Sequence, residues 1–287
     1  MENKIILVTG STDGIGRITA AELARQGHTI IIHGRNKDKA ETVRRQIIKE
    51  TGNQDIGILI ADFLLLAEVK RAAEEIKSNY KRLDVLINNA GAIFDKNREI
   101  TTEGYEKTIA LNLFAPFLLS HLLLELLENS GSGRIINLSS MMHRRGGQTN
   151  FNDFQLQKGY KPTRAYGLSK LYLIWISRRL AKELKEQGKN ITVNVCHPGV
   201  VATTFGQDVD KGLFINLMFK IATLFMITPE QGAKTGIYLA ASPEVDKITG
   251  TFFGNKEKEE KPSEKYYSAE NEQKVWDYCM ESVKEYL

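Results

Sequence analysis

Two side chains that could exchange a proton, Tyr166 and Lys170, stand four positions apart in the run YGLSK. On a helix, residues at this spacing share one face and lie about 6 Å apart along the axis. A tyrosine has an unperturbed pKa of about 10, and a nearby ammonium lowers that pKa by favouring the phenolate. The pair alone is weak evidence, because the same spacing arises by chance in many helices. It predicts acid–base chemistry only where other reactive groups converge on it.

Other polar groups stand where such a convergence is possible. Ser139 and Ser140 end an apolar run, and a serine hydroxyl at that point could hydrogen-bond a substrate oxygen. Asn112 interrupts a helical pattern, where asparagine is unfavourable, so it is either functional or solvent-facing. His197 could act as an acid or base, but we favour a structural role because Tyr166 already fills that position. The run Met141–Arg145 is expected to border the same cleft.

A glycine-rich loop follows the first apolar run, in the sequence TGSTDGIG. Gly10 would permit a tight turn, Gly14 would let the backbone approach a phosphate, and Gly16 would let a helix pack on the strand. A helix that begins here presents free N–H groups and a partial positive charge to a pyrophosphate. The alternative, a simple turn, is less favoured because a strand precedes the loop and a helix follows it. We therefore predict that the loop binds a dinucleotide, through residues Gly10, Ser11, Thr12, Asp13, Gly14, Ile15 and Gly16.

The end of the second apolar run indicates which dinucleotide is bound. An acidic residue here would bind the ribose 2′-hydroxyl of NAD(H), but the sequence reads HGRN, with Arg35 and Asn36. A guanidinium can pair with the 2′-phosphate of NADP(H), so NADP(H) is the predicted cofactor, and NAD(H) remains the other option. The alternative is an ordinary surface arginine. His33 is interpreted as a packing residue at the end of the strand.

The elements that must position these residues alternate along the chain. Continuous apolar runs of this kind are typical of strands buried on both faces of a parallel sheet. The predicted strands are Ile5–Thr9, Thr29–His33, Ile56–Ala61, Val85–Asn88, Arg134–Ser139 and Ile191–Cys196. The predicted helices are Ile15–Gln26, Lys37–Glu50, Leu66–Ser78, Glu103–Glu128, Ala165–Gln187 and Ala269–Tyr286. Right-handed strand–helix–strand units give a three-layer, doubly wound α/β fold, a Rossmann fold with a mostly parallel sheet of about seven strands.

Composition excludes several classes of protein. The chain has 287 residues, 42% hydrophobic and 26% charged, with a formal net charge of +4, which does not favour a nucleic-acid partner. Its two cysteines show no metal spacing, and no cluster of metal ligands is evident, so we expect no metal. No signal peptide and no spanning segment are expected, so a cytoplasmic protein is predicted.

Taken together, the motifs resemble those of the short-chain dehydrogenase/reductase family. The TGxxxGIG loop, the NNAG run at 88–91 and the YxxxK pair all match its pattern, and the resemblance extends over nearly the whole chain. It implies that Ser140, ahead of Ser139, binds the substrate oxygen, and that Asn112 holds a water linking Lys170 to solvent. It further implies that Asp62 accepts from the adenine amino group; the alternative is that Asp62 caps the next helix. The resemblance adds the following cofactor contacts: Phe63, Asn89, Ala90, Gly91, Tyr166, Lys170, Pro198, Gly199, Val200 and Thr203.

One branch of the family is favoured. The spacing from Ser140 to Tyr166 is longer than usual, and the runs AYGLSKL, HPGVVAT and TPEQGA look like the retinol dehydrogenase branch and its bacterial relatives. That branch often prefers NADP(H), but its vertebrate members carry an N-terminal membrane anchor that we do not find here. The family places its substrate lid at about 203–228, and residues 212–227 are rich in Phe, Met and Leu. Lid helix, dimer contact and membrane-surface helix remain open for this segment, with the lid preferred.

The predicted protein is a single domain, residues 1–287. Its cofactor half spans about 1–130, its catalytic and substrate half about 131–287, and a charged segment at 255–265 forms a solvated excursion before the last helix. The predicted function is NADP(H)-dependent hydride transfer between nicotinamide and an alcohol or carbonyl, on an apolar aldehyde, ketone or retinoid-like substrate. A non-catalytic NADP(H)-binding or sensing protein and a Rossmann-like methyltransferase are the competing classes. A homodimer or homotetramer is the assembly that the family suggests, through helices 103–128 and 165–187.

Overall fold

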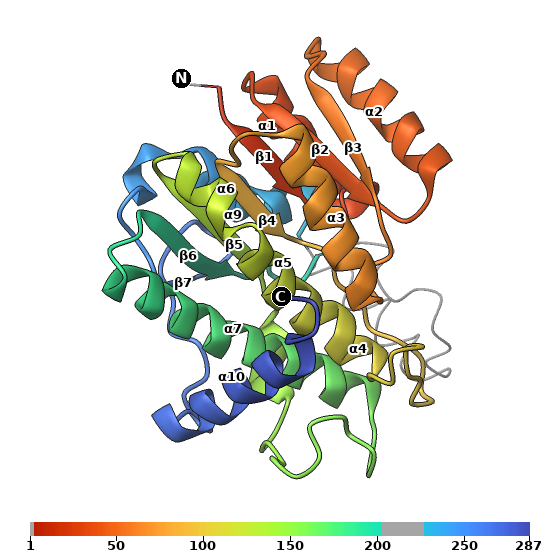
Figure 1. The fold of residues 1–287 in the computed structure, drawn as a ribbon, viewed down its shortest axis with the longest axis vertical. Coiled ribbons are helices and arrows are strands. Elements are labelled where there is room, and N and C mark those ends of the chain that lie inside the picture. Colours follow the sequence, from red (N-terminus) through yellow and green to blue (C-terminus); the bar gives the residue numbers. More distant parts are fainter. Residues whose placement is uncertain (1–2, 202–226) are drawn as a thin grey trace.

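A seven-stranded parallel sheet forms the centre of the molecule in the computed structural model, which describes residues 3–201 and 227–287 (Figure 1). Its strands lie in the order β3-β2-β1-β4-β5-β6-β7. The chain therefore reverses direction across the sheet between β1 and β4, the point at which ligands bind in such folds. The strands are β1 (Ile5–Val8), β2 (Thr29–Gly34), β3 (Ile56–Ile60), β4 (Val85–Asn88), β5 (Gly133–Leu138), β6 (Ile191–Cys196) and β7 (Phe252–Phe253).

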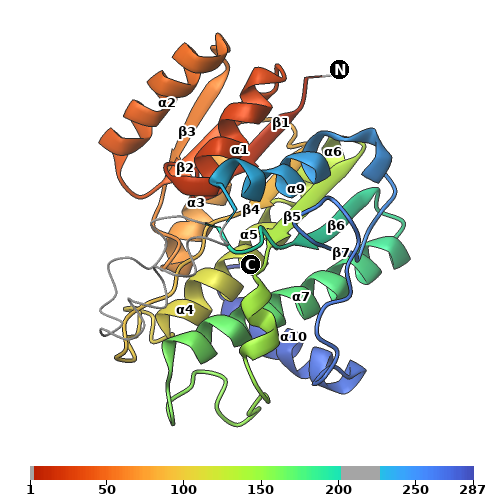
Figure 2. The same ribbon diagram turned by 180° about the vertical axis from the view of Figure 1, so that it is seen from behind.

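Helices cover both faces of the sheet. On one face α1, α2 and α9 pack over alternate strand residues such as Ile6 and Ile32 (Figure 2). On the other, α3, α5 and α7 pack over the intervening residues such as Leu7 and Ile31 (Figure 1). The helices are α1 (Gly14–Arg25), α2 (Lys37–Thr51), α3 (Leu66–Asn79), α4 (Lys107–Ile109), α5 (Ala115–Leu122), α6 (Leu124–Asn129), α7 (Pro162–Glu186), α9 (Pro229–Ala241) and α10 (Ala269–Val283). This three-layer, doubly wound arrangement confirms the predicted fold.

The long helix predicted over Glu103–Glu128 is wrong in detail. The chain instead forms α4, a π-helical turn η1 (Ala110–Phe114), α5 and α6. Pro116 stands just after the π-helical turn, where the hydrogen-bond pattern of the helix changes, and the backbone at Leu123 leaves helical geometry. Two elements absent from the predicted list are α9, which opens with a capping box at Thr228 and Gln231, and the short edge strand β7.

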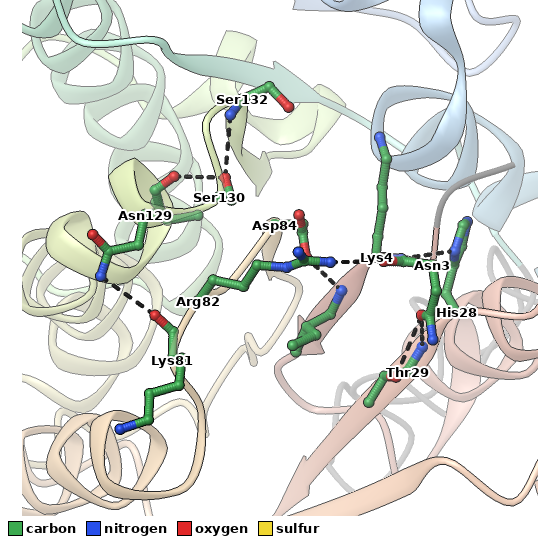
Figure 3. A network of polar contacts seen from close by, with 12 residues as sticks. Asn3, Lys4, His28, Thr29, Lys81, Arg82, Asp84, Asn129, Ser130 and Ser132 are labelled. Atoms are coloured by element: carbon green, nitrogen blue, oxygen red, sulfur yellow. Dashed lines mark hydrogen bonds and ion pairs between the residues drawn. The ribbon is translucent and has the colours of Figure 1, made fainter.

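The amino edge of the sheet is tied together by a network of polar contacts (Figure 3). The Asp84 carboxylate accepts from the Ile5 N–H at 2.7 Å and pairs with Arg82 at 3.3 Å. Arg82 also donates to the carbonyl of Asn3, whose side chain accepts from the Thr29 N–H. These bonds join the starts of β1, β2 and β4. The polar groups named here at the amino edge therefore bond to one another.

Candidate functional site

Ser140, Tyr166 and Lys170 meet at the carboxyl edge of β5. Ser140 follows that strand and opens the short 3₁₀ helix η2 (Met141–Arg145), while the other two lie on α7. The hydroxyls of Ser140 and Tyr166 are hydrogen-bonded to each other. The Lys170 Nζ lies 5.7 Å from the centre of the Tyr166 ring and donates to the Leu138 carbonyl at 2.8 Å. The three groups therefore share one location, and Tyr166 and Lys170 lie on one face of α7, as their spacing predicted.

The two candidate serines have different surroundings. The Ser139 hydroxyl is buried and donates to the Lys170 carbonyl at 2.9 Å, which fixes β5 against α7. The Ser140 Oγ accepts from the Met142 N–H at 3.2 Å and contacts Tyr166, so it lies on the open side of the strand end. This geometry favours Ser140 over Ser139 as the group that would meet a substrate.

Desolvation shifts the pKa values of both proton-carrying groups. It raises the pKa of Tyr166 to about 12, against a smaller lowering by the hydrogen bond from Ser140. It lowers the pKa of Lys170 to about 8. The expectation that the ammonium would pull the tyrosine pKa down is therefore not met by the chain's own groups, because desolvation dominates. At neutral pH the phenol holds its proton.

Asn112 is fully buried, so the solvent-facing interpretation is wrong. It lies in the π-helical turn η1, and its side chain accepts from the Ala92 N–H and donates to the Ala92 carbonyl, each at 2.9 Å, and to the Ser169 hydroxyl at 3.2 Å. A π-turn widens a helix locally and often occurs at functional sites. A Cβ on Gly91 would lie 3.0 Å from the Asn112 Oδ1 and 3.2 Å from the Lys170 Nζ. The absent side chain at Gly91 thus lets β4, η1 and α7 converge.

Gly167 is a site residue that the sequence interpretation missed. A Cβ there would lie 2.7 Å from the Met142 carbonyl oxygen and 2.8 Å from the Cα of Gly146. Real Cβ atoms do not approach backbone so closely, so η2 packs on α7 only because position 167 has no side chain. This contact holds Ser140 beside Tyr166. The signal was a glycine inside a helical pattern, which usually has a packing or functional reason.

The glycine-rich loop has the tight turn and the close helix packing that its glycines predicted. Gly10 and Gly14 have positive φ angles of 62° and 51°, and a Cβ on Gly16 would collide with the Gly10 carbonyl and the Asn89 amide. The Asn89 Nδ2 donates to the carbonyls of Thr9 and Gly10, at 2.7 and 3.1 Å, and so ties β4 to the loop. These contacts leave the start of α1 at the switch point between β1 and β4.

His33 supports the glycine-rich loop through a hydrogen bond to its backbone. Its Nδ1 accepts from the Gly10 N–H at 3.0 Å, so the proton is on Nε2, which donates to the Ala61 carbonyl at 3.1 Å. Desolvation lowers the pKa of His33 to about 4, which keeps the ring neutral. The ring stacks on Phe63 with centroids 3.9 Å apart. The packing role expected for His33 agrees with these contacts.

Three predicted cofactor contacts use their side chains elsewhere. Phe63 is buried beneath His33, so only its backbone could meet a cofactor. The Asn36 side chain caps α2 by accepting from the Lys39 N–H at 2.9 Å. Asp62 accepts from the Leu64 N–H and does not cap α3; the cap is Glu103, which accepts from Leu66 and Ala67. A cap supplied from so far along the chain leaves no local sequence signal.

An open cavity lies beside the glycine-rich loop, and Asn36, which follows Arg35 in the chain, lines it. The cavity measures about 540 Å³ and is lined by Thr12, Asp13, Arg17, Asn36, Asp38, Lys39, Thr42, Val43 and Gln46. Two of its basic groups are engaged, since Arg17 pairs with Glu50 and Lys39 pairs with Asp13. Arg35 is exposed and, within residues 3–201 and 227–287, pairs with no acidic side chain. Its guanidinium is therefore available to an anion.

The turn after β6 carries the last predicted contacts. Gly199 has a φ of 83°, and Pro198 and Gly199 are partly buried, while Val200 is 56% exposed. The His197 Nδ1 accepts from the Gly199 N–H at 3.1 Å, so this histidine shapes the turn. Thr203 and most of the predicted lid at 203–228 lie outside the described residues, as does nearly all of 212–227.

The last helix packs on the helices through which a dimer contact was expected. α10 packs against α7 and the end of η1, with Trp276 edge-on to Phe117 of α5 and Tyr278 beside Phe114. The chain thus covers part of the helix faces through which a dimer was expected. None of the helices in the described ranges has the length and apolar character needed to cross a membrane.

Comparisons with known proteins place this geometry in a family. The family model for short chain dehydrogenase matches residues 4–213. Retinol dehydrogenase 14 of Homo sapiens is 38% identical over 96% of this chain and 85% of its own length. Polyprenol dehydrogenase of Homo sapiens is 37% identical over 96% and 83%. A putative short chain dehydrogenase from Shigella flexneri, solved in complex with NADP, superimposes with a TM-score of 0.70 at 28% identity, covering 89% of this chain and 98% of that one. This chain is accordingly a member of the short-chain dehydrogenase/reductase family of oxidoreductases, in its retinol dehydrogenase-like branch.

Proposed function

We propose that the protein is an NADP(H)-dependent oxidoreductase that interconverts an apolar alcohol and its aldehyde or ketone, with Tyr166 as the proton donor and acceptor. The observation that carries the proposal is the meeting of the Ser140 hydroxyl, the Tyr166 phenol and the Lys170 ammonium at one strand end. A hydroxyl, a phenol and an ammonium at one place suit a reaction in which a carbonyl oxygen gains a proton and negative charge is stabilised.

The residues present fit a nicotinamide dinucleotide. A Cβ on Gly10, Gly16 or Gly91 would lie within about 3.0 Å of neighbouring atoms, and Thr12 and Asp13 at the N-terminus of α1 line the cavity beside the loop. We assign the pyrophosphate to the glycine-rich loop, the nicotinamide end to Asn89–Gly91 and Pro198–Gly199, and the ribose hydroxyls to Tyr166 and Lys170. When bound, the cofactor supplies or accepts the hydride, and the protein supplies orientation and electrostatics.

Proton handling then follows from the pKa directions. In reduction, the Ser140 hydroxyl donates to the carbonyl oxygen and Tyr166, whose raised pKa keeps it protonated, transfers its proton there. The Lys170 ammonium stabilises the phenolate left behind. Asn112 links the Ala92 backbone to Ser169 of α7, and we assign it the water that returns the proton from solvent. Oxidation runs these transfers backwards.

Support for NADP(H) comes from Arg35. Its guanidinium is exposed, the next residue, Asn36, lines the cavity, and the solved structures similar to this chain include one with NADP. Support for an apolar substrate comes from the relatives, one printed as a retinol dehydrogenase and one as a polyprenol dehydrogenase, both acting by name on isoprenoid alcohols. We therefore propose isoprenoid and other long apolar alcohols and aldehydes as the substrate class.

The decisive experiment is a carbonyl panel with NADPH, read by the loss of nicotinamide absorbance, for wild type and Tyr166→Phe in parallel. The panel spans retinal, long-chain aldehydes and a small polar aldehyde. Loss of the phenolic proton should lower kcat about 10²- to 10⁴-fold, while the affinity for NADPH stays near wild type. Tyr80→Phe removes a phenol that follows α3 and lies beside Gly57 of β3, and it should keep full turnover. Undiminished turnover in Tyr166→Phe would show that the proton comes from another group.

Cofactor choice is tested by Arg35→Asp. Removing a charge-assisted pair with the 2′-phosphate and adding repulsion should lower kcat/KM for NADPH relative to NADH by about 10- to 100-fold. Arg25→Asp makes the same change of charge at the C-terminus of α1, where Arg25 pairs with Glu22. It should leave the preference for NADPH over NADH unchanged. Equal ratios in both variants would mean that Arg35 does not contact the phosphate.

A further inference from the structure

The charged side chains of the segment after β7 are exposed, as the sequence suggested, but its backbone folds back toward the site. Gly254 and Lys258 close a turn through a backbone hydrogen bond of 2.9 Å, and the Glu260 N–H donates to the Phe252 carbonyl at 2.8 Å. The Glu260 side chain folds over Gly254, in the space that a Cβ there would fill. The segment Phe252–Ser263 therefore folds back toward the two loops that carry Ser140 and Gly199.

Two buried histidines connect this segment to those loops. His143, 1% exposed, contacts the Ser140 carbonyl through Nδ1 at 2.6 Å, and its Nε2 accepts from the Ser263 N–H at 3.1 Å. A carbonyl only accepts, so the proton of this ring is on Nδ1. His197, 3% exposed, accepts from the Gly199 N–H through Nδ1 and donates from Nε2 to the Glu260 carboxylate at 3.2 Å. The two neutral rings thus carry opposite tautomers, each fixed by both of its partners.

A shared aromatic residue sets the spacing of the two rings. The Phe252 ring lies 5.2 Å from the His143 ring, edge to face, and 5.5 Å from the His197 ring, stacked. A shift of the segment would move both histidines and, through them, the Ser140 carbonyl and the Gly199 amide. Because the Ser140 hydroxyl is itself held by the Met142 N–H and Tyr166, its direction depends on the backbone that His143 holds.

We infer that His143 and His197 are positioning residues, through which the segment Phe252–Ser263 holds the Ser140 hydroxyl and the Pro198–Gly199 turn in register with each other. This inference rests on the proposed function, because it assigns these loops to the substrate oxygen and to the nicotinamide end of the cofactor. Neither histidine exchanges a proton with the substrate. Each acts through the main chain of a site residue.

A pair of matched substitutions separates positioning from packing. In His143→Asn the amide nitrogen can occupy the place of Nδ1 and donate to the Ser140 carbonyl. In His143→Gln the amide group occupies the place of Nε2, so it can accept from the Ser263 N–H but does not bond the Ser140 carbonyl. We expect His143→Gln to lower kcat about tenfold, with NADPH affinity within about twofold of wild type, since misplacement of an oriented group costs mainly the chemical step. His143→Asn, which keeps the bond to the Ser140 carbonyl but loses the one to Ser263, should lose less of kcat. Equal losses in the two folded variants, or no loss in His143→Gln, would overturn the inference.

The second half of the connection is tested at Glu260. Glu260→Ala removes the acceptor of His197 and should raise the KM for NADPH about fivefold with less change in kcat, because the turn at Gly199 is loosened. Glu260→Gln keeps an acceptor oxygen and should stay near wild type. Glu259→Ala, which removes the neighbouring exposed carboxylate, is the control. An unchanged KM in Glu260→Ala would contradict a role for this segment at the turn.

A readout without turnover distinguishes this inference from the proposed function. Hydrogen exchange of the Met142 amide, which donates to the Ser140 Oγ, is followed by NMR. It should be about tenfold faster in His143→Gln and raised less in His143→Asn, whether or not the protein reduces any carbonyl. Unchanged exchange in both variants would refute the positioning of Ser140. Changed exchange in a wild-type protein that reduces no carbonyl would leave the connection standing and count against the proposed reaction alone.

Discussion

The two edges of the sheet use charged groups in opposite ways. At the amino edge, Asp84 is paired with Arg82 and bonded to the Ile5 amide, so its charge is matched within the protein (Figure 3). At the carboxyl edge, the buried Lys170 ammonium donates to the Leu138 carbonyl and, across the part of the chain that the structure describes, pairs with no carboxylate. Burying a charge without a counter-charge is costly, and the pKa of Lys170 is lowered accordingly.

This difference indicates that the polar groups at the amino edge stabilise the fold, whereas those at the carboxyl edge serve the reaction. Polar groups that satisfy one another hold strands in place, and their loss should weaken folding while sparing turnover. Polar groups left with displaced pKa values are typical of reactive sites, although ion-pair networks can also displace a pKa. Substitutions at the two edges should therefore affect different measurements.

Apart from the loss of the Tyr166 phenol, the largest effect on kcat at the carboxyl edge is expected for Gly167→Ala. The added methyl would meet the Met142 carbonyl and the Gly146 Cα, so η2 must move away from α7 and carry Ser140 with it. A displacement of about 1 Å at a reacting group costs on the order of 10²-fold, so kcat should fall by about that factor. Steady-state kinetics of the folded variant provide the measurement.

Gly236→Ala is the matched control for this substitution. Gly236 also lies within a helix, α9, but a Cβ there meets nothing within 4 Å. Alanine in a helix is favoured over glycine by about 1 kcal/mol, so this variant should be slightly more stable and equally active. If Gly167→Ala also kept full turnover, the close approach of η2 and α7 would not be what positions Ser140.

The next effect concerns pH. The pKa of Lys170 is lowered to about 8, so its ammonium is present below that pH and is lost as the pH rises through it. Tyr166, with its pKa raised to about 12, stays protonated over the same range. The rate of carbonyl reduction should therefore be level near neutral pH and fall about tenfold per unit above pH 8. Single-turnover rates with saturating NADPH measure this directly.

Lys170→Met supplies the comparison for the pH profile. Its side chain has no proton to lose, so its turnover should be low and without the fall above pH 8. A wild-type profile that stays level to about pH 10 would show that the Lys170 charge does not assist the proton transfer.

Much of the fold could be predicted from local patterns. The apolar runs identified six of the seven strands because strands buried on both faces admit few polar residues. The spacing of Tyr166 and Lys170 was enough to place both on one helix face. The two-residue strand β7 was missed because Phe252–Phe253 is too short to show any periodicity.

What could not be predicted depends on contacts between distant parts of the chain. The fit of Gly146 against Gly167, the cap of α3 by Glu103 and the return of Glu260 and Ser263 to the site each join residues whose proximity is decided by packing. The raised pKa of Tyr166 is of the same kind, since the extent of desolvation follows from everything packed around the phenol.

The smallest effect on turnover is expected at the amino edge, in Asp84→Ala. The substitution leaves the Ile5 amide and the Arg82 guanidinium without their shared acceptor, which should lower the free energy of unfolding by about 1–3 kcal/mol. Urea unfolding measures this loss, and kcat of the folded protein should stay within about twofold of wild type because the two edges share no partners. Asp84→Asn keeps an acceptor for the amide and should lose less. A fall in kcat that matched the fall in Gly167→Ala would mean that the two edges are coupled through the sheet, and the division between stability and chemistry would fail.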